Sequence, residues 1–251
     1  MTDLAIESAA SAEMDRLWDE RFWTAHYRAG VPVCIEDDLA RWTSVQQMFE
    51  ADSRRFAERP GYVSLGTALT YGHVLDLAKA FGAWLQSVGV QPGDRVALMM
   101  PNCLQYPTAL FGVLFAGAVV VNVNPLYTPR ELHHQLKDSG AVAIVVMDMF
   151  ARTLEQARDG TDVRHVVVTA MGDMMPGLKG VAVSAMMAHV QKLVPAWRMP
   201  DAHGWKALMR RARRRALKPV DTRPEDIAFL QYTGGTSGVA KGAMLTHRNI
   251  L

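Results

Sequence analysis

The feature that most constrains this chain is a glycine-rich stretch near its C-terminal end, residues 231–244, which reads QYTGGTSGVAKGAM. The apolar run Ile227–Tyr232 leads into it and predicts a strand. Glycines allow positive φ and let a ligand approach the backbone, and successive N–H groups in such a turn bind anions. Hydroxyls and one lysine add donors and a positive charge, so the chemistry suits a polyphosphate. The candidate binding residues are Thr233, Gly234, Gly235, Thr236, Ser237, Gly238, Val239, Ala240, Lys241 and Gly242.

Three familiar glycine-rich motifs are excluded by the spacing. A Walker A loop needs a hydroxyl residue directly after its lysine to hold Mg²⁺, but Gly242 follows Lys241. The chain contains no G-x-G-x-x-G, so a dinucleotide fold is not supported. Val239 stands where a serine-hydrolase elbow would need its last glycine, which argues against that class.

The longer run of residues 232–249, YTGGTSGVAKGAMLTHRN, resembles the phosphate-binding signature of the adenylate-forming ligases. This superfamily comprises the acyl-CoA synthetases, firefly-type luciferases and nonribosomal-peptide adenylation domains. Within it, the run is most similar to bacterial long-chain fatty-acyl-CoA synthetases. Many relatives carry Thr where this chain has Ser237, and the hydroxyl is kept. The alternative reading is a glycine-rich loop that only closes a strand–helix turn.

Strand and helix patterns alternate through the rest of the chain. Expected strands cover residues 62–65, 95–100, 119–123, 141–147, 164–169 and 227–232, and expected helices cover 43–59, 70–88, 104–116, 129–139 and 150–158. Thr70 and Thr128 suit helix N-caps, and Gly140 suits a helix end. Thr246 also suits an N-cap, although one turn at most follows it. This order predicts an α/β fold with a largely parallel sheet flanked by helices.

The family resemblance extends from about residue 43 to the end. Residues 69–71, 93–97, 100–102 and 116–132 are similar to opening motifs of the same ligases, where they are mostly architectural. The resemblance implies a lead segment, residues 1–42, and a partial N-terminal domain of the acyl-CoA synthetase/luciferase-like fold, residues 43–251. Relatives run to roughly twice this length. We therefore expect a chain truncated after the phosphate-binding loop, without the C-terminal domain and its catalytic lysine, for which Lys241 should not be mistaken.

Two stretches are harder to interpret. In the lead segment, Trp18, Phe22, Trp23 and Tyr27 are expected to pack on a domain surface rather than bind a ligand. Between residues 171 and 226, residues 174–177 are expected to form a loop, and Met186, Val190 and Leu193 are expected to line a short helix. Residues 205–217 carry six basic side chains and an apolar side. They predict either a solvated helix face, which we favour, or a basic helix lying on an anionic membrane.

Composition sets the remaining limits. The 251 residues are 49% hydrophobic and 21% charged with a formal net charge of +2, a balance typical of a globular protein. Cys34 and Cys103 match no metal or redox spacing and are expected to be free thiols. His133 and His134 are expected to be surface residues, and His247 either touches phosphate or sits in a helical turn. No protein-borne metal site, catalytic residue, signal peptide, membrane span or nucleic-acid module is predicted.

The resemblance implies ATP-dependent activation of a long-chain fatty acid to its acyl-CoA through an acyl-adenylate, with release of AMP and pyrophosphate. The implied cofactors are ATP and Mg²⁺, with coenzyme A as co-substrate. The expected location is the cytoplasm, with peripheral contact at the inner face of the membrane as an open alternative. Two other functions stay open: an adenylating ligase for another carboxylic acid, and a catalytically incompetent fragment that at most binds nucleotide.

Overall fold

The structure is a computed structural model that describes residues 22–31, 41–233 and 240–251. The chain divides into two compact units, Met1–Arg41 and Trp42–Leu251. In the first unit, the described residues form a 3-10 helix, η1 (Phe22–His26), and a turn in which the Val31 amide donates to the Arg28 carbonyl. Of the four lead-segment aromatic residues, Tyr27 is exposed and Trp18 lies outside the described residues.

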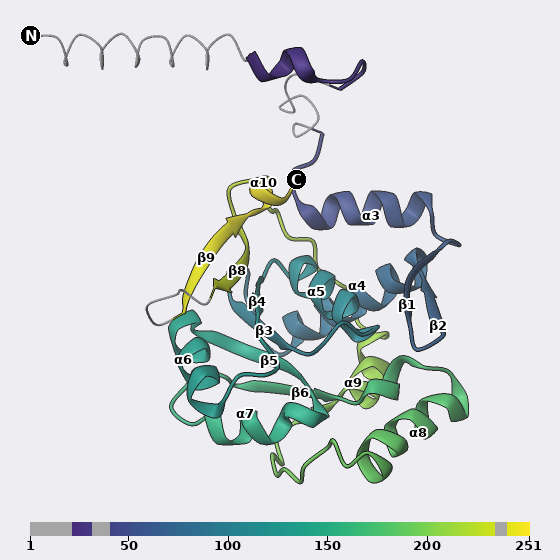
Figure 1. Ribbon diagram of the computed structural model, residues 1–251, viewed down its shortest axis with the longest axis vertical. Coiled ribbons are helices and arrows are strands. Elements are labelled where there is room, and N and C mark those ends of the chain that lie inside the picture. The colour runs from purple at the N-terminus through teal and green to yellow at the C-terminus, as the bar shows by residue number, and fades with distance from the viewer. Residues whose placement is uncertain (1–21, 32–40, 234–239) are drawn as a thin grey trace, which may run out of the picture. The chain divides into compact units, whose positions relative to one another are not determined.

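A mixed sheet organises the second unit (Figure 1). Its order within the described residues is β7-β6-β5-β3-β4-β8-β9. The strands are β3 (Arg95–Met99), β4 (Val119–Asn122), β5 (Ala141–Met147), β6 (His165–Thr169), β7 (His203–Gly204), β8 (Ile227–Thr233) and β9 (Lys241–Thr246). All adjacent pairs are parallel except β8 and β9, which are antiparallel. The predicted α/β fold with a largely parallel sheet is therefore confirmed.

Helices cover both faces of this sheet (Figure 1). On one face lie α4 (Tyr71–Ser87), α5 (Gln105–Phe115) and α9 (Trp205–Ala212), and on the other lie α6 (Pro129–Ser139) and α7 (Ala151–Ala157). Side chains alternate along β3, so that Val96 and Leu98 join the first core and Ala97 and Met99 the second. Because the strands are buried on both faces, their sequences are nearly continuous apolar runs.

Smaller elements surround this core. Helix α3 (Val45–Arg55) and a two-stranded antiparallel sheet of β1 (Pro60–Ser64) and β2 (Thr67–Thr70) pack outside α4 and α5. The remaining elements are η2 (Asp148–Phe150), η3 (Met171–Met174), α8 (Gly177–Ala185), η4 (Met186–Val190) and α10 (His247–Ile250). No helix in the described ranges is long and apolar enough to cross a bilayer.

The expected helix caps are present. The Thr70 hydroxyl accepts a hydrogen bond from the His73 amide at the start of α4. Thr128 and Glu131 form a capping box at the start of α6, and Gly140 ends that helix at φ 60°. Thr246 caps α10 together with Asn249. These local signals act over three or four residues, which is why the sequence alone is enough to predict them.

Other expectations need correction. The helix expected over residues 43–59 is Val45–Arg55, because the Ser44 hydroxyl caps it by accepting from the Gln47 amide. The basic helix expected over residues 205–217 ends at Ala212. Residues 174–177 were expected to form a loop, yet α8 begins at Gly177 directly after Pro176. Strand β9 (Lys241–Thr246) was not expected, because residues 241–244 were assigned to the glycine-rich stretch and Thr246 to a helix N-cap.

Candidate functional site

The candidate phosphate-binding residues lie at a β-hairpin on one edge of the sheet. Strands β8 and β9 pair antiparallel, and Thr233 is the register partner of Lys241. Residues 234–239 lie outside the described residues, so of the ten candidates the structure places Thr233, Ala240, Lys241 and Gly242. Thr233 and Lys241 are both exposed and stand side by side at the base of the glycine-rich segment. One hydroxyl and one ammonium group are therefore brought to the same place.

Lys241 is not a loop residue, as the sequence had suggested, but the first residue of β9. Strand pairing fixes its backbone, because Tyr232 pairs with Gly242 and Thr233 with Lys241. A lysine at the end of a paired strand loses less freedom on binding a ligand than one in an unpaired loop. The hairpin thus gives the positive charge a defined starting position.

Side-chain hydrogen bonds from neighbouring elements hold β8 in place. The Asn122 side-chain amide donates to Gln231 Oε1 at 3.0 Å, and Asn122 Oδ1 accepts from the Tyr106 hydroxyl at 2.9 Å. Gln135 Nε2 donates to the Asn122 backbone carbonyl at 2.8 Å. This chain of hydrogen bonds connects α5, β4, β8 and α6. It fixes the strand that leads into the candidate site.

A second contact anchors the hairpin to α6. The Tyr232 hydroxyl donates to Asp138 Oδ2 at 2.6 Å. Burial raises the pKa of the Tyr232 phenol, and the neighbouring Asp138 carboxylate raises it further. The phenol therefore keeps its proton and serves as a hydrogen-bond donor. Gly242 lies against the Tyr232 ring, where an added Cβ would approach two ring carbons to 3.0 Å.

Sequence reasoning missed the residues that position the hairpin: Tyr106, Asn122, Gln135 and Asp138. Their partners lie up to 109 positions away along the chain. The signal available was a polar residue at the end of a buried strand, since Asn122 follows three valines in β4. Polar groups at the carboxyl ends of parallel strands face the usual binding edge of such sheets.

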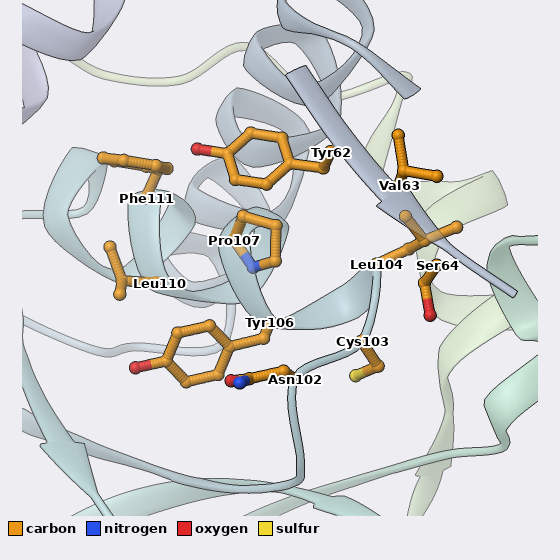
Figure 2. Close-up of a pocket in the computed structure, with 10 residues that line it drawn as sticks. All are labelled: Tyr62, Val63, Ser64, Asn102, Cys103, Leu104, Tyr106, Pro107, Leu110 and Phe111. Atoms are coloured by element: carbon orange, nitrogen blue, oxygen red, sulfur yellow. The ribbon is translucent and has the colours of Figure 1, made fainter. Parts of the chain in front are cut away.

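A hollow of about 340 Å³ lies at the carboxyl end of β3 (Figure 2). Tyr62 from β1, Cys103 from the loop after β3, and Tyr106, Leu110 and Phe111 from α5 contribute to its wall. Burial raises the pKa of the Cys103 thiol and of the Tyr62 and Tyr106 phenols. These groups are therefore protonated near neutral pH and offer no activated nucleophile. As expected, Cys103 is free, and Cys34 lies outside the described residues.

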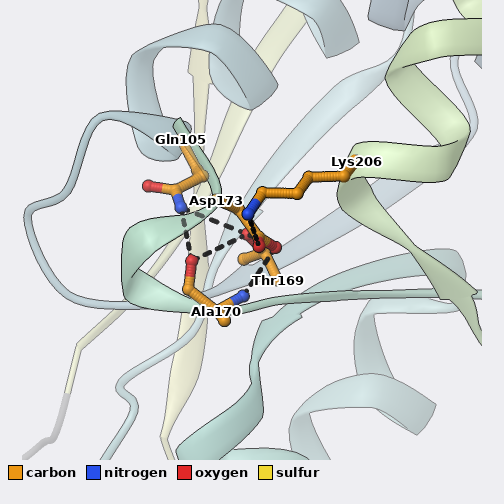
Figure 3. A network of polar contacts seen from close by, with 5 residues as sticks. All are labelled: Gln105, Thr169, Ala170, Asp173 and Lys206. Atoms are coloured by element: carbon orange, nitrogen blue, oxygen red, sulfur yellow. Dashed lines mark hydrogen bonds and ion pairs between the residues drawn. The ribbon is translucent and has the colours of Figure 1, made fainter. Parts of the chain in front are cut away.

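A polar network closes the carboxyl end of β6 (Figure 3). Gln105 Nε2 donates to Thr169 Oγ1 at 3.2 Å and to the Ala170 carbonyl at 2.8 Å. Asp173 accepts from the Ala170 amide and from the Thr169 hydroxyl, and Lys206 lies 3.4 Å from its carboxylate. The network ties α5, β6, η3 and α9 together through Gln105 Nε2 and the Asp173 carboxylate, while Gln105 Oε1 is buried without a hydrogen-bond partner. It is a structural support for η3.

The histidines that the sequence singled out have structural contacts. His247 is buried, and its Nδ1 accepts a hydrogen bond from the Val45 amide at 3.2 Å. This contact favours the structural alternative over phosphate binding. His133 is half-buried, with Nδ1 2.9 Å from the Ala157 carbonyl. Among the described residues, no group of three or more His, Cys, Asp or Glu is arranged to hold a metal ion.

Comparison with known sequences gives consistent matches. The sequence model of the AMP-binding enzyme family matches residues 49–251. The long-chain-fatty-acid–CoA ligase of Yersinia pestis is 51% identical over 92% of this chain. The ligase of the same name from Bacillus subtilis is 36% identical over 91% of this chain. These relatives are longer, and the chain spans only 41% and 40% of their lengths.

Solved structures share the fold. The apo structure of MbtA from Mycobacterium smegmatis is 28% identical, with a TM-score of 0.64 over 82% of this chain and 34% of that protein. The anthranilate CoA ligase AuaEII in complex with anthranoyl-AMP is 21% identical, with a TM-score of 0.67 over 82% of this chain and 35% of that protein. At 21% identity the second likeness shows the fold alone.

Proposed function

Because the chain belongs to the family of AMP-binding enzymes, we propose that the protein activates a long-chain fatty acid for transfer to coenzyme A. In the first step a carboxylate oxygen attacks the α-phosphorus of ATP, the bond to the leaving pyrophosphate breaks, and an acyl-adenylate forms. In the second, the thiol of coenzyme A attacks the acyl carbonyl carbon, the mixed anhydride breaks, AMP leaves, and the thiol proton passes to solvent. The chain spans 41% of the length of the Yersinia pestis ligase, and the proposal places none of its residues in the bond-breaking steps.

One observation carries the proposal. The chain is 51% identical to a long-chain-fatty-acid–CoA ligase over 92% of its length, and the family model covers the hairpin strands. The geometry agrees with this choice, since Thr233 and Lys241 meet at the two ends of the glycine-rich segment. The anthranilate CoA ligase shares the fold alone at 21% identity, so this likeness does not favour an aryl acid as substrate.

We assign Thr233–Gly242 to the β- and γ-phosphates of ATP. Backbone N–H groups of the glycine-rich segment, the hydroxyls of Thr233, Thr236 and Ser237, and the Lys241 ammonium are the donors. Fixed donors of this kind stabilise the negative charge that shifts to the leaving pyrophosphate, which is usually the largest catalytic contribution. The support is the exposure of Thr233 and Lys241 and their fixed strand positions.

The donor set bears on Mg²⁺ as well. Ammonium and amide groups bind phosphate and repel a cation, and the candidate residues include no carboxylate. The ten candidates therefore fit the phosphates better than the metal, to which their side chains offer only the hydroxyls of Thr233, Thr236 and Ser237. Mg²⁺ enters this proposal only as the partner of ATP, bound by phosphate oxygens and water.

The test is fatty-acid-dependent exchange of pyrophosphate into ATP by the whole protein. We expect Lys241→Ala to lower exchange by about 10²-fold, because one preorganised donor to the transferring group is lost. Gly235→Val should have a comparable effect, since a side chain blocks close approach of the phosphate. Lys218→Ala is the matched control, because Lys218 is an exposed lysine whose backbone bonds the Gln86 side chain of α4, outside the hairpin. Full exchange in Lys241→Ala and Gly235→Val would overturn the assignment.

Two further outcomes are informative. A panel of aryl, short-chain and amino acids in the same assay identifies the acid, and a preference for any of these replaces the long-chain fatty acid in the proposal. For the 251 residues alone, we propose at most nucleotide binding without turnover. Calorimetry with ATP measures the binding, and turnover by the 251 residues alone contradicts this part.

A further inference from the structure

Helix α8 and η4 form one continuous helical segment, residues 177–190, whose outward side is apolar. The exposed apolar residues recur at spacings of three and four, as on one face of a helix. They are Leu178, Val181, Ala182, Ala185, Met186 and Val190. Leu178 is 86% exposed and Val190 76%. Contiguous exposed apolar side chains mark a contact surface, whereas single ones do not.

The inward side of the same segment is formed by a residue without a side chain. Gly180 is the residue of α8 that is buried, and it packs directly against the Gly172 backbone of η3. An added Cβ at either glycine would meet the carbonyl oxygen of the other. The segment is therefore attached to the molecule by a backbone contact, and its larger apolar side chains are exposed.

Charge around the segment is strongly biased. Residues 174–200 contain no Asp or Glu, and Lys179 and Lys192 lie exposed on or beside the helix. Residues 174–220 hold ten of the chain's 27 basic residues and one of its 25 acidic residues. The rest of the chain is therefore net negative, although the formal charge of the whole is +2. This concentration of cations favours an anionic partner.

Helix α9 and the three arginines that follow it, residues 213–215, hold six of these ten basic residues. A groove of about 690 Å³ is lined by Met174, Met175 and Pro176 at the base of α8, by Lys206 and Arg210 of α9, and by Arg213 directly after α9. The large apolar residues of α9, Trp205, Leu208 and Met209, are buried, so α9 cannot insert them into a bilayer. Its basic side chains remain exposed. The two helices together present an apolar face with cations beside it.

We propose that the outward face of α8 and η4 docks on the surface of an anionic phospholipid bilayer. Leu178, Val181 and Val190 enter the boundary between headgroups and acyl chains, and the helix axis lies along the membrane plane. Lys179, Lys192 and the arginines of α9 contact lipid phosphates. A protein partner is less suited to this face, because lysines are depleted at the cores of protein interfaces. The surface is separate from the β8–β9 hairpin and goes beyond the proposed reaction.

The test is co-sedimentation of the whole protein with vesicles. Vesicles of phosphatidylcholine with phosphatidylglycerol are compared with phosphatidylcholine alone, at low and at high salt. We expect binding to the anionic vesicles, weakened by salt. The double variant Leu178→Glu, Val190→Glu should lower binding at least about tenfold, because two charges replace inserted apolar groups. Lys179→Gln and Lys192→Gln should each lower it about fivefold.

The matched control is Leu126→Glu with Val63→Glu, at residues that are 81% and 69% exposed and lie outside the segment. It adds the same two charges and should bind as the wild type does. Equal binding by the segment variant and the control overturns the proposal. Absence of vesicle binding by the wild type also overturns it. In that case, a lower melting temperature of the Leu178→Glu, Val190→Glu variant indicates a face covered by the rest of the protein, and a changed oligomeric state indicates a face covered by a second copy. Vesicle binding does not depend on nucleotide, so failure of the proposed reaction leaves this result distinct.

Discussion

Helices α8 and α9 lie close together in the sequence but differ in the exposure of their apolar residues. In α9, Trp205 and Leu208 are 2% and 4% exposed. In α8, Leu178 and Val181 are 86% and 58% exposed. Both sequences mix apolar residues with cations, so both are amphipathic. The difference shows that an amphipathic pattern reveals two faces of a helix without revealing which of them faces the core.

The packing explains the difference. The Trp205 ring lies 5.3 Å from the Phe81 ring of α4, between centroids, and α9 fills a site beside β6 and β7. Its arginines face outward, because burying an unpaired charge is costly. Helix α8 instead contacts η3 through Gly180. A helix attached by a glycine cannot bury large side chains at the same contact, so Leu178 and Val181 face away from it.

The largest expected effect separates the two helices by stability. Trp205→Ala should lower the free energy of unfolding by about 3–5 kcal/mol, because it leaves a cavity between α9 and α4. Leu178→Ala should change it by no more than about 0.5 kcal/mol, since that side chain is exposed. Urea denaturation followed by circular dichroism measures both. A loss in Leu178→Ala comparable to that in Trp205→Ala would show that the outward face of α8 is covered in solution and would break the comparison.

The sequence predicts an element well when its local pattern has one interpretation, and poorly when its packing decides the outcome. Strand β5 was predicted with its observed bounds, because seven consecutive apolar residues between Gly140 and Asp148 fit little else. Helix α8 was missed, since Pro176, Gly177 and Gly180 are typical of a loop. Strand β9 was missed because it begins Lys241-Gly242 and becomes a strand by pairing with β8.

The sequence predicted which residues form the candidate site, but not which residues hold them in position. The glycine-rich run pointed to Thr233 and Lys241 from local composition alone. The bonds from Asn122 to Gln231 and from Tyr232 to Asp138 span 109 and 94 positions, and only the sheet order brings these residues together. Residues 234–239 lie outside the described part of the chain, so their phosphate contacts stay a prediction.

The second prediction tests the glycine contact that holds α8. Gly180→Ala should gain about 1 kcal/mol of helix propensity. It should nevertheless destabilise the protein by about 1–2 kcal/mol, because the added methyl overlaps the Gly172 carbonyl oxygen. Urea denaturation gives the sign. Hydrogen exchange should quicken in residues 177–190 and stay unchanged in residues 205–212.

The matched control is Gly204→Ala, at the N-cap of α9, where an added Cβ meets nothing within 4 Å. It should leave hydrogen exchange in α8 unchanged. If Gly180→Ala instead stabilises the protein, helix propensity outweighs the overlap. The backbone contact is then not what keeps the large apolar residues of α8 outside, and the comparison needs another cause.

The smallest expected effect is on the pH dependence of stability, and it compares a buried histidine with an exposed one. His247 is buried, and its Nδ1 accepts from the Val45 amide, whereas His189 of η4 is exposed. Burial lowers the pKa of His247, and the carboxylate of Asp226 only partly opposes this. The unfolded chain, with a histidine pKa of about 6.5, therefore takes up a proton that the folded protein resists. Stability should be full above about pH 6.5 and fall as the pH drops toward the lower folded pKa.

Urea midpoints measured from pH 7.5 to pH 5.5 check this slope, a range above the ordinary pKa values of carboxylates. Burial raises the pKa of Asp148, but this carboxylate is present in every variant, so its contribution cancels in the comparison. His247→Gln keeps a hydrogen-bond acceptor but does not titrate, so its slope should be shallower than that of the wild type. Some slope should remain, because burial also lowers the pKa of His165. His189→Gln removes an exposed histidine and should leave the wild-type slope unchanged. An unchanged slope in His247→Gln would mean that the folded protein accommodates the charged ring, and that burial does not separate these two histidines as it separates α9 from α8.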